Sequence, residues 1–247
     1  MKQQLRILFL SFTFFFISFV QAQKTAIVAQ KIIDKSIDIC GGNLYDTKKV
    51  SFFFRKNQYL SKTHAGIKTL ERISVKNEVK TRDVMTSSSF KRLVNDKVFN
   101  VPDSMVQRYA NSINSVHYFS RLPYGLNDAA VIKELLGTVV IKEKEYYKVK
   151  VTFDQKNGGT DFDDTYIYWF NKKTYKPDYL AYKFHVDGGG IRFREAYNER
   201  YVEGIRFVDY LNFKANKNFD LLKVEELYTT KKLKLLSKIE LEKINVE

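Results

Sequence analysis

Cysteine is almost absent from this 247-residue sequence, which contains only Cys40. An internal disulfide needs two cysteines, so the fold must be stabilised by packing alone. Because unpaired cysteines are often buried, we interpret Cys40 as a small core residue rather than as a nucleophile or a link to another chain.

The sequence also lacks a linker rich in proline, glycine or serine, a low-complexity tract and an obvious internal repeat. It contains only 3 prolines and 11 glycines, so a flexible connection between two domains has no compositional signal. All-β chains of roughly 200–250 residues often form one domain. We therefore expect a single β-rich domain over residues 23–247.

Long runs of one charge are missing as well, since no block of five or more basic residues interrupts the chain, although the net charge is +14. Arms that bind nucleic acid usually contain such blocks, so we expect no nucleic-acid partner. We interpret the lysines and arginines as a solvated basic surface. Binding of an acidic partner or of an anionic lipid head group is the alternative.

Familiar catalytic signatures are absent too. The sequence contains no Gly-x-Ser-x-Gly, His-Glu-x-x-His, phosphate-loop or Cys-x-x-Cys pattern. The three histidines are far apart in sequence, which by itself excludes nothing. We therefore expect no metal and no cofactor, and we favour binding over catalysis.

The amino terminus has the layout of a secretory signal. Lys2 and Arg6 precede an apolar, phenylalanine-rich run over residues 7–20, and Ala22 closes a small-residue cleavage site. A spanning helix needs roughly 20 apolar residues, so a membrane anchor is the less suitable interpretation. We predict a signal peptide over residues 1–22 and a periplasmic or secreted protein. No second apolar run follows, so we expect no transmembrane segment in the mature chain.

Two segments of the mature chain have helical periodicity. In the first, residues 25–39, the apolar side chains cover one half of the helical wheel and the charged ones the other. In the second, Asp103–Ser120, Pro102 and Asp103 mark the start. The pattern also allows a short helix over Asp128–Leu136.

The rest of the chain is typical of β-strands, with apolar and polar residues alternating at period two. The strand candidates are Val50–Arg55, Arg72–Lys76, Thr138–Lys142, Tyr146–Phe153, Thr165–Phe170, Tyr179–Val186, Ile191–Tyr197, Gly204–Phe213, Leu221–Tyr228 and Leu233–Val246. We therefore predict an α+β, mostly β fold. It is a single antiparallel, strongly curved sheet of about ten strands, an open half-barrel with an N-terminal helix and mid-chain covering helices.

Several of these strands are apolar on both faces, as in Tyr166–Phe170 and Ile205–Phe213. An antiparallel sheet with one wet face would show polar residues there, so both faces need cover. Helices could cover one face, and a ligand cavity could lie between sheet and helix. Our candidate ligand-binding residues are Tyr168, Phe170, Phe184, Phe193, Phe207 and Tyr210 in the sheet wall, Tyr118, Phe119 and Tyr124 in the cover, and Arg194 for a polar head group.

An acidic segment with Asp161, Asp163 and Asp164 could hold a hard cation through its oxygen atoms, and His185 and Asp187 could join it. It lacks the later glutamate and turn glycine of a calcium loop, so we interpret it as a solvated loop. An exported hydrolase that uses Asp161, Asp163, His185 or Asp187 is the enzymatic alternative.

Two other polar features have plain structural interpretations. His117 lies on the apolar face of its helix, where a buried, hydrogen-bonded core histidine is a better interpretation than a catalytic base. Arg192 and Arg194 share one face of a strand and could grip an anion. We favour cross-strand pairing of such arginines with neighbouring carboxylates.

Six segments of the chain carry a family resemblance. They are Asn111–Phe119, Leu122–Asp128, Gly158–Asp161, Tyr179–Tyr182, Gly189–Glu195 and Gly204–Tyr210. In these segments, which recur in order, the chain resembles a family of exported Bacteroidota proteins whose domain has no assigned function. The order of helices and strands also resembles the periplasmic lipoprotein-carrier fold, an open half-barrel whose apolar concave face accepts acyl chains. This second resemblance implies a scaffold and does not fix a function.

The sequence therefore leaves three hypotheses. The first is a periplasmic or secreted protein that binds or carries a lipid or another apolar small molecule between the curved sheet and its covering helices. The second is the exported hydrolase described above. The third is an envelope protein-interaction module whose apolar surface meets a partner protein.

Overall fold

The computed structural model describes residues 25–156, 163–185 and 188–247. The predicted signal peptide, Asp161 and Asp187 lie outside these described residues. The chain divides into two compact units. Unit 1 consists of Met1–Lys35, Asp128–Phe193 and Ala215–Leu233, and unit 2 consists of Ser36–Asn127, Arg194–Lys214 and Lys234–Glu247. The single domain over residues 23–247 stays a prediction.

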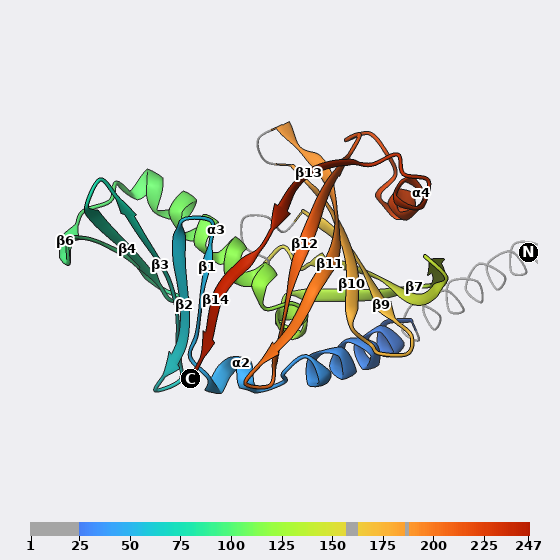
Figure 1. Ribbon diagram of the computed structural model, residues 1–247, viewed down its shortest axis with the longest axis horizontal. Coiled ribbons are helices and arrows are strands. Elements are labelled where there is room, and N and C mark those ends of the chain that lie inside the picture. Colours follow the sequence, from blue (N-terminus) through green and yellow to red (C-terminus); the bar gives the residue numbers. More distant parts are fainter. Residues whose placement is uncertain (1–24, 157–162, 186–187) are drawn as a thin grey trace, which may run out of the picture. The chain divides into compact units, whose positions relative to one another are not determined.

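The strands form two antiparallel seven-stranded sheets, not the single sheet of about ten strands that we predicted (Figure 1). The first sheet has the strand order β14-β1-β2-β3-β4-β5-β6, and the second has the order β13-β12-β11-β10-β9-β8-β7. Neither sheet closes on itself. Period-two patterning identifies which faces are buried, but it does not say which strands pair, so the division into two sheets could not be read from it. The broader prediction of a mostly β, α+β fold with few helices is confirmed.

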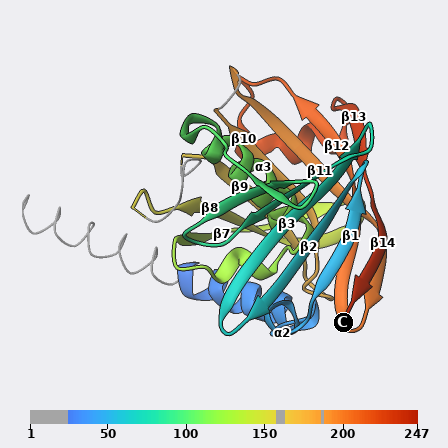
Figure 2. The same cartoon turned by 90° about the vertical axis from the view of Figure 1, so that its left-hand side faces the viewer.

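Unit 2 contains the whole of the first sheet, in which each strand from β1 to β6 pairs with the next. Figure 2 shows β14, β1, β2 and β3 of this sheet side by side. Its strands are β1 (Val50–Phe54), β2 (Asn57–His64), β3 (Ile67–Lys76), β4 (Val79–Met85), β5 (Phe90–Val94), β6 (Lys97–Phe99) and β14 (Leu241–Val246). The last of these comes from the far end of the chain and pairs with β1, with Val50 opposite Val246.

Helix α3 (Asp103–Ser120) packs on this sheet and keeps the bounds that the sequence predicted. Polar contacts tie the helix to β3: Arg72 donates to Ser112 at 2.7 Å, and His117 Nε2 lies 3.1 Å from the backbone oxygen of Glu71. His117 is fully buried, so its interpretation as a core histidine is confirmed. Burial lowers the pKa of His117 to about 3, although the contact with the Glu71 carbonyl works in the opposite direction.

The core of unit 2 joins β14, β1 and β2, at one edge of the sheet, to the strand β12 (Ile205–Ala215). Its buried side chains are Tyr45, Val50, Phe52, Tyr59, Ile205, Phe207, Leu241 and Val246. Tyr45 belongs to the short helix α2 (Leu44–Thr47), which follows the buried Cys40 and two glycines. Gly41 has a φ of +134°, and a Cβ atom there would lie 3.2 Å from the Cα atom of Ile205. Glycine is therefore required where this turn meets β12.

Unit 1 contains β7 (Val131–Ile141), β8 (Lys144–Phe153), β9 (Thr165–Asn171) and β10 (Pro177–Phe184). Strand β11 (Gly190–Val202) begins in unit 1 and continues into unit 2, which also holds β13 (Lys234–Ile239). The short helices η3 (Leu221–Lys223) and α4 (Val224–Thr229) cover an aromatic cluster in unit 1. In it, the ring of Phe193 stacks on Tyr228 at 4.6 Å and lies 5.5 Å from Trp169.

Residues 25–39 are helical, as predicted, but three other secondary-structure predictions are wrong. Leu233–Val246 is not one strand, because the chain divides at Glu240 into β13 and β14, which belong to different sheets. Asp128–Leu136 is not a helix, because most of it enters β7, where valine, isoleucine and threonine favour an extended chain. Leu221–Tyr228 is not a strand. The side chain of Asp220 accepts a hydrogen bond from the backbone of Leu222 and so starts a helical turn.

None of the helices over residues 25–156, 163–185 and 188–247 is long and apolar enough to cross a bilayer.

Candidate functional site

Unit 2 contains a pocket of about 220 Å³ between the carboxyl-terminal half of α3 and the strands that face it. Its lining residues are Phe54, Arg55, Ser115, Val116, Phe119, Ser120, Arg194, Val208, Tyr210, Asn212, Ser237, Ile239 and Leu241. More than half of these side chains are apolar or aromatic, two are arginines and none is acidic. The pocket therefore combines an apolar wall with positive charge.

The periodicity of the helix and of the strands places these side chains on the faces that line the pocket. On α3, Ser115 and Val116 lie one turn before Phe119 and Ser120, so the four residues share one face of the helix. On β12, the lining residues are two positions apart, which places them on one face of the strand. Across the sheet, Tyr210 pairs with Ile239, which continues that face into β13.

Arg194 supplies the buried positive charge of the pocket. The residue is only 8% exposed, and its guanidinium lies 3.8 Å from the ring centroid of Phe119 and 5.9 Å from that of Tyr210. A guanidinium is well suited to contact with aromatic faces, because it interacts with their π electrons while carrying its charge. The second arginine, Arg55, is exposed and stands over the ring of Phe54.

Asn212 adds a polar group to the wall. Its side-chain nitrogen donates to the hydroxyl of Ser237 at 3.2 Å, in keeping with the pairing of these two residues across β12 and β13. Its other amide atom, Oδ1, is buried without a hydrogen-bond partner among the residues that the structure describes. A buried polar atom of this kind has lost its hydrogen bonds to water, and a bound molecule that donates to it would offset this cost.

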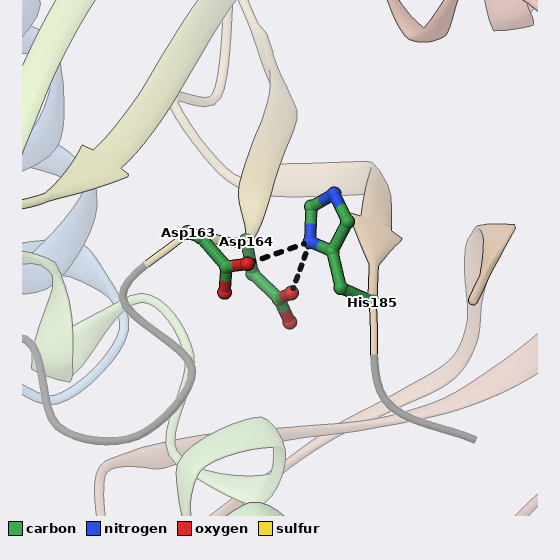
Figure 3. Close-up of side chains that lie close together, drawn as sticks. All are labelled: Asp163, Asp164 and His185. Carbon is green, nitrogen blue, oxygen red and sulfur yellow. Dashed lines mark ion pairs between the residues drawn. The ribbon is translucent and has the colours of Figure 1, made fainter. Parts of the chain in front are cut away.

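A second group of chemically reactive side chains lies in unit 1, where Asp163, Asp164 and His185 converge (Figure 3). His185 Nδ1 is 3.2 Å from Asp163 Oδ2 and 3.5 Å from Asp164 Oδ1. Asp164 is buried, whereas Asp163 and His185 are about half exposed. None of the three lines the pocket of unit 2.

Comparison with protein families identifies the chain. Residues 6–241 match the family of unknown function DUF6503. The chain belongs to this family. The origin of DUF6503 proteins in Bacteroidota and their export stay predictions. No curated protein matches the sequence.

Solved structures give weaker likenesses for this DUF6503 chain. It is 11% identical to a LolA superfamily protein from Nitrosomonas europaea, with a TM-score of 0.47 and coverage of 89% of this chain and 91% of that one. A DUF1329 family protein from Desulfovibrio piger is 11% identical, with a TM-score of 0.40 and the same two coverages. The lipoprotein LppX from Mycobacterium tuberculosis is 13% identical over 66% of this chain and 90% of that chain, with a TM-score of 0.29. No score reaches 0.5, so we draw no functional conclusion from them.

Three of the ten predicted ligand-binding residues of this DUF6503 chain line the pocket, namely Phe119, Arg194 and Tyr210. The other two predicted cover residues contact a lining residue and a core residue, respectively. Tyr118 contacts Phe119 edge-on at 5.4 Å, and Tyr124 stacks on Tyr45 at 4.8 Å.

The remaining predicted residues do not line the pocket. Phe207 belongs to the core of unit 2. Tyr168, Phe170 and Phe193 are fully buried in unit 1, and Phe184 is half-buried there beneath the guanidinium of Arg192. The strands that are apolar on both faces therefore contribute mainly to packed cores.

Sequence reasoning missed the other ten lining residues, which are Phe54, Arg55, Ser115, Val116, Ser120, Val208, Asn212, Ser237, Ile239 and Leu241. Phe54 and Leu241 are 187 positions apart in the printed sequence, but they pair in the register of β1 and β14. Nothing local in the sequence signals this pairing. A usable signal existed only on α3, where Val116 lies beside the apolar face that predicted the helix.

Proposed function

We propose that this protein binds a small amphiphile in the pocket of unit 2, with an apolar chain against the aromatic wall and an anionic end at Arg194. The main support for this proposal is that the lining of an apolar pocket includes two arginines and no acidic side chain. This function belongs to a binding or carrier protein and not to an enzyme.

The size of the pocket limits the apolar part of the ligand. Pockets for drug-sized ligands usually measure roughly 300–1,000 Å³, whereas this one measures about 220 Å³. It therefore suits one short chain, or the end of a longer one, better than a folded or multi-chain lipid. Each methylene that leaves water for such a wall contributes roughly 0.8 kcal/mol to binding.

The charge of the pocket selects the polar end. The guanidinium of Arg194 lies near the rings of Phe119 and Tyr210, and a guanidinium is the group that binds a carboxylate or a phosphate with two parallel hydrogen bonds. The buried Oδ1 of Asn212 would accept a hydrogen bond from a hydroxyl or amide of the same ligand. A carboxylate or phosphate amphiphile with one nearby donor group satisfies both sites.

A substitution that fills the pocket tests this proposal. Val116→Trp places a bulky ring in the space that the ligand would occupy, whereas Asn114→Trp places the same ring on the exposed side of α3. Binding of a fluorescent fatty acid should be lost in the first variant and retained in the second. Native mass spectrometry of the purified wild-type protein should also show a retained small amphiphile. Equal binding by both variants would remove the proposal.

We also propose that the protein is exported to the periplasm or the medium, with cleavage after Ala22. The support is the layout of the first 22 residues. Amino-terminal sequencing of protein recovered outside the cytoplasm should begin at Gln23. An envelope protein that delivers or receives the ligand is the partner we predict for this role.

A further inference from the structure

The cluster of Asp163, Asp164 and His185 is positioned by a regular part of the sheet. The two aspartates directly precede β9, and the histidine directly follows β10. These strands are antiparallel neighbours, and Thr165 pairs with Lys183 at the end nearest the cluster. The strand register therefore brings the three side chains together, since each lies one or two residues beyond the last paired positions (Figure 3).

The distances within the cluster suit a shared cation. Metal–ligand bonds of about 2.0–2.2 Å at tetrahedral angles separate neighbouring ligand atoms by roughly 3.3–3.6 Å. The imidazole nitrogen lies 3.2 Å and 3.5 Å from one oxygen of each carboxylate. All three candidate ligand atoms lie within 4.8 Å of one another, so each is close enough to the other two to share one ion.

The charge and the burial of the cluster also favour a bound cation. The cluster brings two carboxylates within a few ångströms of each other, and the side chain of Asp164 is only 9% exposed. A divalent cation would neutralise both charges. The ion pairs alone offer a weaker explanation, because exposed pairs such as that of Asp163 and His185, both about half exposed, contribute little to stability.

We propose that Asp163, Asp164 and His185 form a site for a first-row divalent cation of the Zn²⁺ class. The imidazole nitrogen distinguishes this class from Ca²⁺ and Mg²⁺, which prefer sites built from oxygen atoms. The exposed side of the cluster leaves a coordination position open to solvent. This site is independent of the amphiphile pocket, with which it shares no residue.

The experiment uses the full chain after removal of metal with a chelator. Titration with Co²⁺ should give visible absorption bands that saturate at one equivalent, and Zn²⁺ should displace the Co²⁺ because it binds such ligands more tightly. Ca²⁺ in large excess should not displace it. Absence of a stoichiometric Co²⁺ signal, or displacement by Ca²⁺, would overturn the proposal.

Variants connect the signal to these residues. Asp164→Asn and His185→Gln should each weaken Co²⁺ binding by more than about tenfold, a loss seen even for groups that only support a metal ligand. His64→Gln, which changes an exposed histidine at the end of β2, should leave the affinity unchanged. His185→Gln is the decisive variant, because its half-exposed side chain can be replaced without disturbing a core. Wild-type affinity in a folded His185→Gln protein contradicts the assignment.

Discussion

Replacing Arg194 with methionine tests the charge of the pocket separately from its shape. Methionine keeps an unbranched, flexible side chain beside Phe119 and Tyr210, although a shorter one, and removes the guanidinium. The apolar wall, built mainly from other residues, is left in place. The substitution should therefore act on the anionic end of a ligand and leave binding of its chain almost unchanged.

The expected magnitude follows from the burial of the arginine. The residue is 8% exposed, so a hydrogen bond that it makes to an anion is shielded from solvent. Hydrogen bonds to charged groups contribute about 1.5–3 kcal/mol, which corresponds to a loss of roughly 10- to 150-fold in affinity. A fatty alcohol of the same length should bind the wild type and Arg194→Met with nearly equal affinity, since neither complex contains the ion pair.

The assay is competition of a fatty acid and of its alcohol against a fluorescent probe, at matched ionic strength. Arg108→Met is the control, because Arg108 is an exposed arginine of α3 that does not line the pocket. Circular dichroism checks that each variant is folded. If Arg194→Met weakens the acid and the alcohol equally, or weakens neither, the arginine does not select an anionic end and the reasoning fails.

Three further predictions concern stability. Because the pKa of His117 is lowered to about 3, the unfolded chain binds a proton between pH 6.5 and 3 that the native state does not. The free energy of unfolding should then decrease by about 1.4 kcal/mol for each unit by which the pH is lowered in that window, and by less in His117→Gln. Unfolding titrations at several pH values measure this slope. Gly41→Ala should destabilise the protein by more than about 1 kcal/mol in urea, and by more than Gly66→Ala, where φ is also positive but no atom lies within 4 Å. Burial alone would raise the pKa of Asp83, but hydrogen bonds from Arg92 and Arg72 hold it below its usual value, so this carboxylate stabilises the native state above about pH 4 and loses that effect in acid. Asp83→Asn should lower the thermal midpoint at pH 7 by more than at pH 3, and an equal shift at both pH values would contradict this assignment.

Helices with a continuous apolar stripe could be predicted from the sequence. The bounds of α3 agree at both ends, because Pro102 marks its start, the apolar face runs to His117 and Pro123 follows its end. The strand Val131–Ile141 was harder to predict from the sequence. Its residues alternate between half-buried and exposed, and which of them are covered depends on how the strand lies against β8 and its neighbours. The apolar residues of η3 and α4 gave no clear period, and the capping role of Asp220 decided their structure.

The site could be predicted only in part, and for a related reason. Phe119, Arg194 and Tyr210 were identified because aromatic and arginine side chains are conspicuous in strands and on a helix face. Phe54 and Leu241 became lining residues through a pairing between distant segments. Similarly, His185 reaches Asp163 only through the register of β9 and β10, which period-two patterning leaves open.

The pairing of β1 with β14 has a consequence for how this chain reaches its native state. Lys49 and Glu247, which exchange backbone hydrogen bonds beside this pair, are 198 positions apart. A ribosome therefore releases β1 long before the strand that protects its edge exists, and closing so large a loop is slow. In the interval that edge can pair with other chains. Polypeptides truncated before residue 241 should consequently aggregate or depend on holding chaperones, and dilution should favour refolding of the intact chain.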